Sequence, residues 1–341
     1  MNQLATALAP SPVDAIEALI GNTPLLEIRY RHRRREGRIY AKYELENMTG
    51  SVKDRMAAHI IRRGYETGVL RPGDLICEAS SGNTGIAMAA IGRALGHPVR
   101  IYLPDWMSPE RAQLIRTFGA EVVPVSHQAG GFVGAVELAA RWGEEHDHVF
   151  LSQQFDNPVN VEAHELTTGP ELEQQLAHFG RRADAFVAGV GTGGTVMGVG
   201  RFLRRRGRRV AVHPLEPSNS PTLRTGVRCG EHRIQGISDE FVPRICHLDE
   251  LDSIVDVWDG DAILMAQKLC RELGLAVGIS SGANVLGAIQ VAAGLAAGAN
   301  VATILPDSNK KYLSTDLFHE EPVRAGYLTP EVELLGFVAT R

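Results

Sequence analysis

Short apolar runs alternate with helical patterns through the middle of the chain. The apolar runs predict buried strands at 74–79, 99–104, 121–126 and 149–152. The segments between them predict helices at 84–96, 108–119 and 131–142. In the second helix, Ser108 is expected to cap the start, Pro109 takes the first position and Gly119 lies just past the end. This βαβαβαβ order is typical of a parallel sheet covered by helices.

A second series of the same kind follows. It predicts strands at 183–190, 209–216 and 300–306, and helices at 196–205, 261–274 and 284–298. We therefore expect an α/β fold with two α/β units that meet near residues 150–160. The stretch from Leu273 to Pro306 carries no charge, but glycines interrupt it and alanine dominates it. It is expected to be a buried loop, helix and strand, and no membrane association is predicted.

Composition narrows the class of protein further. A chain of 341 residues has room for about two domains, and a net charge of −5 argues against a nucleic-acid partner. The four cysteines form no CxxC motif, which suits a reducing cytoplasm and predicts no metal site. The N-terminus lacks the basic and apolar regions of a signal peptide, so we expect a cytoplasmic protein.

The clearest chemical signal is the glycine-rich segment GVGTGGTVMGVG. Gly189, Gly191 and Gly194 satisfy GxGxxG between a predicted strand and a predicted helix, and Glu216 follows at the end of the next strand. An NAD-dependent oxidoreductase is therefore one hypothesis. Unobstructed backbone N–H groups at a helix N-terminus bind any phosphate, however, and the hydroxyls of Thr192 and Thr195 also suit a compact phosphate monoester.

Lysine is scarce, with five residues against thirty arginines. Lys53 follows Ser51 and precedes Asp54, an S-x-x-D pattern that predicts a capping box and puts Lys53 in the first turn of a helix. A cation there opposes the helix dipole, which favours the neutral amine that imine formation requires. Lys42 is expected on the polar face of a strand, and Lys311 in a turn-like pair, so both are weaker candidates.

Two further turns bring polar groups to helix starts. The segment EASSGNTG places hydroxyls, an amide and backbone donors between a strand and a helix, which suits a carboxylate. Its polar residues are Ser80, Ser81, Gly82, Asn83 and Thr84. The segment VGISSGAN repeats the arrangement with Ser280 and Ser281, and for this one helix capping is the simpler interpretation.

Taken together and in order, these segments resemble the fold type II (β-family) pyridoxal-phosphate enzymes, and most closely the cysteine synthase and cystathionine β-synthase catalytic-core family. Further similar stretches are GNTPLL (21–26), MSPER (107–111), QQFDNP (153–158), TTGPEL (167–172) and LPDSNKKYLST (305–315). The resemblance implies two open, mostly parallel sheets covered by helices, as in the tryptophan synthase β-chain. It also implies a smaller domain at 46–157, a larger one at 12–45 plus 158–317, and a C-terminal tail at 318–341.

The same resemblance assigns roles to residues. Lys53 would hold pyridoxal 5'-phosphate as a Schiff base and move the α-proton, Asn83 would bind the phenolic oxygen, and Ser280 would face the pyridine nitrogen. The cofactor phosphate is expected at Gly191, Thr192, Gly193, Gly194 and Thr195. The amino-acid substrate is expected at Ser80, Ser81, Gly82, Thr84, Gln154 and Gly236.

The implied reaction is β-replacement on an activated serine through an α-aminoacrylate, with O-acetylserine and sulfide giving cysteine and acetate in a homodimeric enzyme. Gly236 and Ile237 precede Ser238, Asp239 and Glu240, where sulfhydrylases often read GIG. Acidic groups there favour an amine or amino-acid nucleophile over sulfide. Serine or phosphoserine with homocysteine or an amine, as in cystathionine β-synthase or a diaminopropionate-type synthase, is therefore the alternative. A catalytically silent, partner-binding homologue is a third hypothesis.

Overall fold

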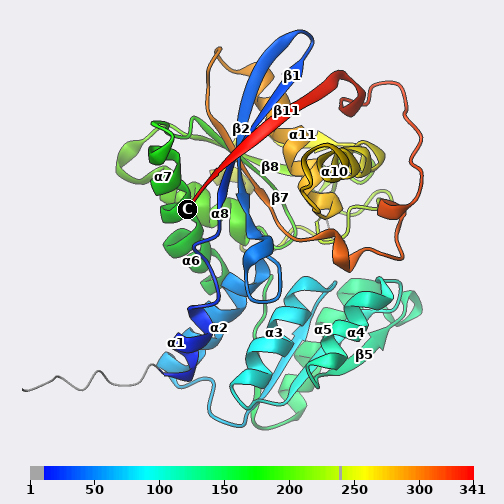
Figure 1. Ribbon diagram of the computed structural model, residues 1–341. Helices are drawn as coiled ribbons and strands as arrows, with labels where there is room; N and C mark the ends of the chain where they lie inside the picture. The colour runs from blue at the N-terminus through cyan, green and yellow to red at the C-terminus, as the bar shows by residue number, and fades with distance from the viewer. Residues whose placement is uncertain (1–10, 238–239) are drawn as a thin grey trace, which may run out of the picture.

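The protein is built on two sheets, each covered by helices (Figure 1). The computed structural model describes residues 11–237 and 240–341. The larger sheet has the strand order β11-β1-β2-β10-β7-β8-β9. Its strands are β1 (Leu25–His32), β2 (Arg35–Tyr43), β7 (Ala185–Gly189), β8 (Ala211–Pro217), β9 (Val255–Val257), β10 (Val301–Leu305) and β11 (Val332–Thr340). Five neighbouring strands, β2, β10, β7, β8 and β9, run parallel to one another. The strand β1 is antiparallel to both of its neighbours, β11 and β2.

Helices cover both faces of the larger sheet (Figure 1). One face carries α10 (Asp259–Leu273) and α11 (Ile279–Gly294), and the other α6 (Val159–Ala163), α7 (Gly169–His178) and α8 (Gly194–Leu203). Side chains of a strand alternate between these two cores: Ile39 and Ala41 point to the first, and Tyr40 between them to the second. Burial on both faces explains why the parallel strands are apolar throughout.

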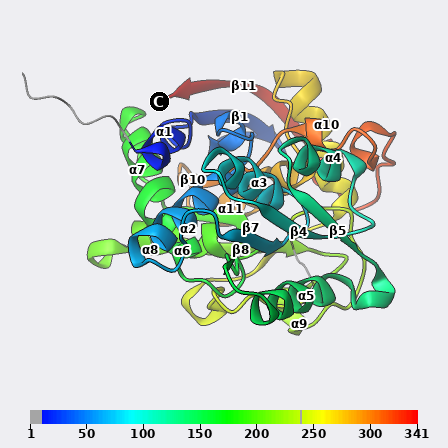
Figure 2. The same ribbon diagram turned by 90° about the horizontal axis from the view of Figure 1, so that it is seen from below.

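The smaller sheet has four parallel strands in the order β5-β4-β3-β6. They are β3 (Leu75–Ala79), β4 (Val99–Pro104), β5 (Glu121–Val125) and β6 (Val149–Leu151). Helices α2 (Lys53–Thr67), α3 (Asn83–Ala94) and α4 (Pro109–Thr117) cover one face, and α5 (Gly131–Glu145) covers the other (Figure 2). The short helix α1 (Pro12–Glu17) packs on α2, and α9 (Thr222–Thr225) follows β8. The predicted fold class is confirmed, while the exact domain limits stay a prediction.

One predicted cap takes a different role. Helix α4 starts at Pro109 as expected, and Ser108 holds the capping position, but its side chain caps nothing. Instead the Ser108 hydroxyl donates to the backbone carbonyl of Lys311 at 2.9 Å. The hydroxyl therefore ties α4, on the smaller sheet, to the segment that follows β10 of the larger sheet.

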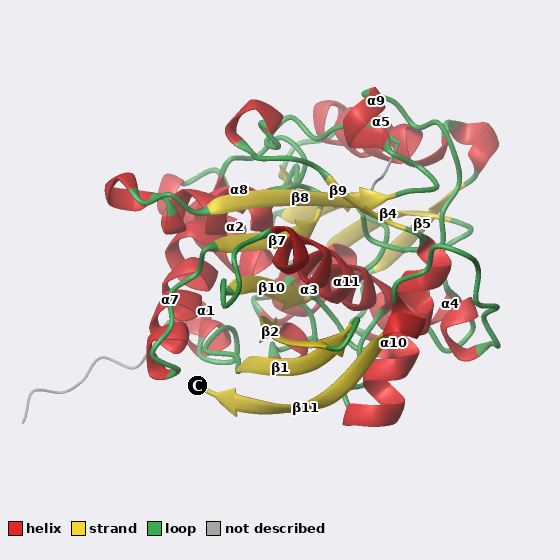
Figure 3. Cartoon of the chain, turned by 90° about the horizontal axis from the view of Figure 1, so that it is seen from above, coloured by secondary structure: helices red, strands yellow, loops and turns green. Residues whose placement is uncertain are grey.

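The end of the chain belongs to the larger sheet. We assigned no element to residues 318–341 from the sequence, yet β11 pairs along all of β1 and forms one edge of the sheet (Figure 3). The sequence did not predict β11 because the strand is partly exposed along most of its length, and its apolar and polar residues therefore show no clear alternation.

A buried cluster of charges joins α2 to the larger sheet. The guanidinium of Arg55, on α2, donates to Glu44 at 2.6 and 2.8 Å and to Glu171, on α7, at 2.7 and 2.8 Å. Lys42 lies 2.7 Å from the same Glu171 carboxylate. Lys42 was expected on a polar strand face, but only 1% of it is exposed, because the partner carboxylates are buried with it. The cluster fixes the position of α2, which begins with Lys53.

We expect Arg55→Met to lower the free energy of unfolding by about 3–5 kcal/mol, because it leaves two carboxylates without their buried partner. Urea denaturation of the purified protein measures this. Arg62→Met, one and a half to two turns further along α2, is the matched control, since Arg62 pairs with Glu17 near the surface. It should cost at most about 1 kcal/mol, and equal losses in the two variants would contradict the role of the cluster.

The helices of the described residues are each too short or too polar to cross a membrane.

Candidate active site

Four helices begin at one cavity between the two sheets. Lys53 opens α2, Asn83 opens α3, Gly194 opens α8 and Ser280 stands in the first turn of α11. Residues from the N-terminal turns of all four helices line the cavity. Of the predicted site residues, those that line it are Lys53, Ser81, Asn83, Thr84, Gln154, Gly191, Thr192, Thr195, Gly236 and Ser280. Parallel sheets bind ligands at the carboxyl ends of their strands, and β3, β7 and β10 all end here.

The glycine loop between β7 and α8 has no room for side chains at its glycine positions. A Cβ on Gly194 would lie 2.0 Å from the Asn160 amide oxygen, and one on Gly191 would lie 2.4 Å from the carbonyl of Gly236. Gly193 has a φ of +87°, which glycine adopts without strain. The Thr192 hydroxyl accepts from the Asn160 amide at 2.9 Å. The result is a fixed loop at the N-terminus of a ten-residue helix, which suits a phosphate group.

Lys53 stands in the first turn of α2, as predicted, but the predicted capping box does not form. The residue at the N-cap is Val52, and no side chain caps the helix. The carboxylate of Asp54 instead accepts from the backbone N–H and the hydroxyl of Thr49, at 2.7 and 2.5 Å. Ser51 accepts the backbone N–H of Lys53 at 3.3 Å. Asp54 therefore shapes the turn before the lysine rather than the helix end itself.

A neutral histidine lies beneath the cavity. Burial, together with the charge of Lys53, lowers the pKa of His164 to about 3. Its ring contacts Thr168 through Nδ1 at 2.9 Å and Thr195 through Nε2 at 3.3 Å. His164 belongs to a π-helical turn, His164–Thr168, that connects α6 to α7. The histidine thereby holds a hydroxyl of the glycine loop without adding a charge next to Lys53.

The loop between β3 and α3 is held by its own polar groups. The Ser80 hydroxyl accepts from the backbone N–H groups of Gly82 and Gly85, at 3.0 and 2.9 Å. A Cβ on Gly82 would lie 2.1 Å from the side chain of Arg111, so only glycine fits there. Thr84 donates its hydroxyl to the Gln154 amide oxygen at 2.6 Å. The loop is thus preformed, and the assignment of Ser80, Ser81, Gly82, Thr84 and Gln154 to the substrate stays a prediction.

The buried carboxyl group of Glu78 fixes the position of Gln154. Glu78 accepts from the Ser152 hydroxyl at 2.6 Å and from the backbone N–H of Gln154 at 3.1 Å. Burial raises the pKa of Glu78 to about 7, although these hydrogen bonds act in the opposite direction. Glu78 does not line the cavity, but it fixes a residue that does.

The amide of Asn83 is part of a network that we did not predict. Its nitrogen donates to Asp307 at 2.8 Å, and its oxygen accepts from the ammonium of Lys311 at 2.9 Å. Tyr312 donates to the same Asp307 carboxylate at 2.8 Å, and the guanidinium of Arg111 lies 4.6 Å from the ring centre of Tyr312. Lys311 ends a short 3-10 turn, Asn309–Lys311, which agrees with the predicted turn-like pair, but only 3% of Lys311 is exposed. The sequence signal was the segment PDSNKKY, which carries three of these residues, Asp307, Lys311 and Tyr312, together.

Arg111 gives an independent sign of an anionic ligand. It lines the cavity, is almost fully buried, and its Nε and one terminal nitrogen have no hydrogen-bond partner among the described residues. Unpartnered buried donors are costly, and a charged one most of all. With the glycine loop, the lysine and the hydroxyl of Ser280, this arrangement fits a compact, doubly anionic phosphate monoester that bears a carbonyl group.

The dinucleotide hypothesis finds less support in the geometry. Glu216 would have to reach toward a ribose beside the glycine loop. Its carboxylate is completely buried and accepts the backbone N–H of Leu223, in α9, at 2.7 Å.

Residues Ser238 and Asp239, which were expected to influence the second substrate, lie outside the described residues. Among the described residues there is no group of three or more His, Cys, Asp or Glu side chains placed to bind a metal ion.

We expect the wild-type protein to become less stable as the pH rises, because the buried carboxyl of Glu78 then loses its proton. The unfolded chain releases this proton near pH 4.5, but the folded protein keeps it until about pH 7. The stability contributed by the neutral carboxyl is therefore complete below about pH 4.5 and lost by about pH 7. Relative to Glu78→Gln, the free energy of unfolding should fall by about 3 kcal/mol across this window.

Urea denaturation at a series of pH values measures the difference. Glu137→Gln, which removes an exposed carboxylate from α5, is the control for the loss of one acidic group. Parallel pH profiles for the wild type and Glu78→Gln would contradict the raised pKa.

Comparisons with known proteins agree with this geometry. The family model described as "Pyridoxal-phosphate dependent enzyme" matches residues 16–307. A cysteine synthase from Staphylococcus aureus is 42% identical over 311 residues, which are 91% of this chain and 99% of that protein. The crystal structure of a hydrogen sulfide-producing enzyme from Fusobacterium nucleatum has a TM-score of 0.94 and 47% identity, with 96% of this chain and 98% of that one covered.

A third similar structure belongs to an enzyme with a different name. An O-acetylserine-dependent cystathionine β-synthase from Helicobacter pylori has a TM-score of 0.81 and 33% identity, with 89% of this chain and 98% of that one covered. The match of the family model to most of the chain, together with the level of identity, decides the family. The chain belongs to the pyridoxal-phosphate-dependent enzymes, as an enzyme of the cysteine synthase type.

Proposed function

We propose that the protein catalyses β-replacement on an activated L-serine, converting O-acetylserine and sulfide to L-cysteine and acetate. One observation carries the proposal: Lys53, Asn83, the 191–195 loop and Ser280 meet at a single cavity, with the 80–84 loop beside them. The relatives named cysteine synthase support it. So does the Fusobacterium nucleatum enzyme, a mutant of which is known with an alpha-aminoacrylate intermediate.

The chain supplies distinct groups for each part of pyridoxal 5'-phosphate. Lys53 would bind its aldehyde carbon, Asn83 its phenolic oxygen and Ser280 its ring nitrogen, while Gly191, Thr192, Gly193, Gly194 and Thr195 would hold its phosphate. When bound, the cofactor supplies an electron sink for the bonds of the substrate α-carbon. A serine hydroxyl at the ring nitrogen stabilises positive charge there less than a carboxylate would. Ser280 therefore favours rapid loss of a good leaving group over a long-lived carbanion.

The protein residues orient and deprotonate the substrate. The 80–84 loop offers backbone N–H groups at the start of α3, where a carboxylate is favoured. Gln154 and Gly236 would complete this site, and Glu78 keeps Gln154 in place. The Lys53 amine, once released, is the base for the α-proton, and it returns that proton at the end. The Cβ–O bond to acetate breaks before sulfide forms the new Cβ–S bond, so acetate carries away the bonding electrons.

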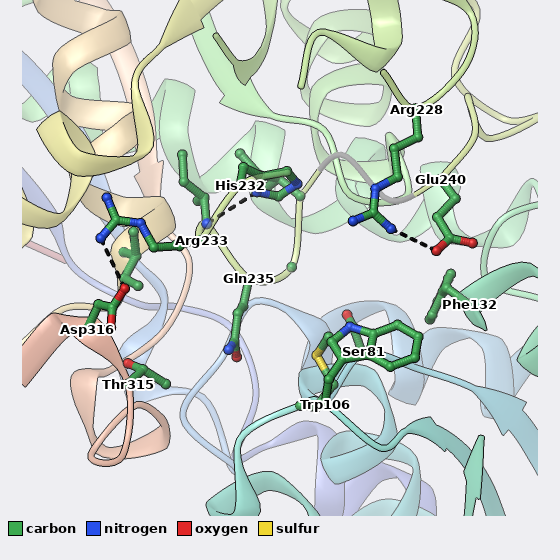
Figure 4. A pocket seen from close by; sticks show the side chains of 15 residues that line it. Ser81, Trp106, Phe132, Arg228, His232, Arg233, Gln235, Glu240, Thr315 and Asp316 are labelled. Carbon is green, nitrogen blue, oxygen red and sulfur yellow. Dashed lines mark hydrogen bonds and ion pairs between the residues drawn. The ribbon is translucent and has the colours of Figure 1, made fainter. Parts of the chain in front are cut away.

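A second candidate function keeps the same cofactor and changes the other substrates. Serine or phosphoserine with homocysteine or an amine would use the same carboxylate loop. The observation that favours it is Glu240, an acidic group in a second cavity (Figure 4) that shares the lining residues Gln235, Gly236 and Ile237 with the first. A panel of donors and nucleophiles, with the products identified by mass spectrometry, separates the two.

We also propose a cytoplasmic homodimer. The family resemblance supports the dimer, and the absence of disulfides among the four cysteines supports a reducing compartment. Sedimentation and cell fractionation test the two statements separately.

We expect Lys53→Ala to remove the imine absorbance of the protein loaded with pyridoxal 5'-phosphate, because no imine to the chain can then form. Production of cysteine from O-acetylserine and sulfide should fall by at least about 1,000-fold, as is typical when a covalent catalytic group is lost. Lys268→Ala, which removes an exposed ammonium paired with Glu272, is the control. Retained imine absorbance in Lys53→Ala would contradict the assignment.

We expect Gly194→Ala to weaken binding of pyridoxal 5'-phosphate by about 10-fold or more, which corresponds to about 1.4 kcal/mol. The added methyl group collides with Asn160 and displaces the loop. Equilibrium dialysis of the apoprotein measures the affinity. Gly294→Ala, at the last residue of α11, meets no atom within 4 Å and serves as the control. Equal affinities in the two variants would show that the loop does not hold the phosphate.

A further inference from the structure

The network behind Asn83 leaves its amide only one orientation. The amide nitrogen donates to the Asp307 carboxylate at 2.8 Å, and the amide oxygen accepts from the Lys311 ammonium at 2.9 Å. A half-turn of the amide would place its N–H groups against the ammonium and its oxygen against the carboxylate, and both contacts would be repulsive. Asn83 lines the catalytic cavity. The group that its amide offers to the cavity is therefore the second N–H, which has no partner among the described residues.

The acceptor for Asn83 is itself held in place. Asp307 is completely buried, and the oxygen that accepts from Asn83 also accepts from the Tyr312 hydroxyl at 2.8 Å. Its backbone carbonyl accepts the N–H of Gly278 at 2.9 Å. A Cβ on Gly278 would lie 2.2 Å from the other carboxylate oxygen. The Asp307 side chain is thus packed closely on one side and hydrogen-bonded on the other.

The segment after β10 also holds the turn before Lys53. The backbone N–H of Val52 donates to the carbonyl of Pro306 at 2.8 Å. The Lys311 ammonium has a second, longer contact of 3.4 Å with the carbonyl of Gly50. One segment therefore positions both the lysine that would bind the cofactor aldehyde and the amide that would bind its ring oxygen.

Lys311 is a buried cation that contacts no carboxylate among the described residues. Its two hydrogen bonds go to an amide oxygen and a backbone carbonyl, whereas the equally buried Lys42 lies 2.7 Å from a carboxylate. Burial lowers the pKa of Lys311, although the charges of Asp307 and Asp54 act in the opposite direction. A buried charge with only neutral hydrogen-bond partners is costly. An anion in the adjacent cavity would reduce that cost.

We propose that Lys311 and Asp307 are positioning residues that keep Asn83 as a hydrogen-bond donor to the ionised ring oxygen of pyridoxal 5'-phosphate. The inference rests on the cofactor assigned in the proposed function and adds what selects the charge of that oxygen. A donor that is itself bonded to an ammonium stabilises an oxygen anion more strongly than a free amide does. The proton then leaves the ring oxygen for the nitrogen of the imine with Lys53, and no other group is gained or lost.

The absorbance of the loaded protein reports this charge form. An imine with an ionised ring oxygen and a protonated nitrogen absorbs in the visible, whereas the form with a neutral oxygen absorbs in the near ultraviolet. We expect Lys311→Met to lower the ratio of the visible to the near-ultraviolet band by about 10-fold, because it removes the nearby charge and frees the amide. Lys310→Met is the matched control and should keep the wild-type ratio, because Lys310 belongs to the same short turn but is exposed.

Cofactor affinity gives a second readout. Equilibrium dialysis of the apoprotein compares pyridoxal 5'-phosphate with the analogue that lacks the ring oxygen. Lys311→Met should bind the complete cofactor about 10-fold more weakly than the wild type does, and the analogue equally well. A merely structural role of Lys311 would weaken both compounds alike. Lys311→Gln removes the charge but keeps a polar side chain in the buried turn, so it is the second variant and should change both readouts in the same direction.

Two results would overturn the inference: wild-type band ratios in both Lys311 variants, or equal weakening of the complete cofactor and the analogue. Either result can occur while the wild type forms the imine and makes cysteine from O-acetylserine and sulfide. A wild type that shows no imine absorbance, or that makes no cysteine, would instead contradict the proposed function. The two failures are therefore distinguishable.

Discussion

The site depends on one constraint, the convergence of helix N-termini between two mostly parallel sheets. Each start leaves backbone N–H groups without partners, and each is therefore most stable beside an anion or a polar ligand. In this protein α2, α3, α8 and α11 begin at the same cavity. The buried Arg55 cluster holds α2 against the larger sheet, and Ser108 and Asn83 tie the smaller sheet to the segment after β10. The surrounding contacts thus keep four helix starts, from both sheets, in one place.

Much of this arrangement could be predicted because its signals are local. Alternation of apolar runs and helical patterns predicted the four strands of the smaller sheet and β7, β8 and β10 of the larger sheet, since strands buried on both faces must be apolar throughout. It did not predict β1, β9 or β11. Glycines at 191 and 194 signalled positions where no side chain fits, and the structure shows the collisions that a side chain would meet there. The position of Lys53 followed from the turn before it. These inferences needed only neighbours in the sequence.

The rest depended on partners far away in the sequence. Ser108 carries a capping signal, yet its hydroxyl bonds to the carbonyl of Lys311, because a tertiary partner competed with the helix end. Lys42 was expected on the polar face of a strand, and the Glu171 carboxylate from another segment makes its burial tolerable, as the Asn83 amide does for Lys311. The final strand was missed because its burial comes from β1, about three hundred residues earlier. The pattern of apolar and polar residues within a short stretch of sequence contains no information about such distant partners.

The phosphate side and the substrate side of the cavity depend on different parts of the chain. The 191–195 loop offers backbone groups, which substitution of a side chain leaves in place, provided that the glycines remain. The other side of the cavity instead presents side chains such as Ser81 and Gln154, and a single substitution replaces each of them. Substitutions on that side can therefore change the shape and polarity of the cavity while the glycine loop is unchanged. In this architecture such a change requires no new phosphate site.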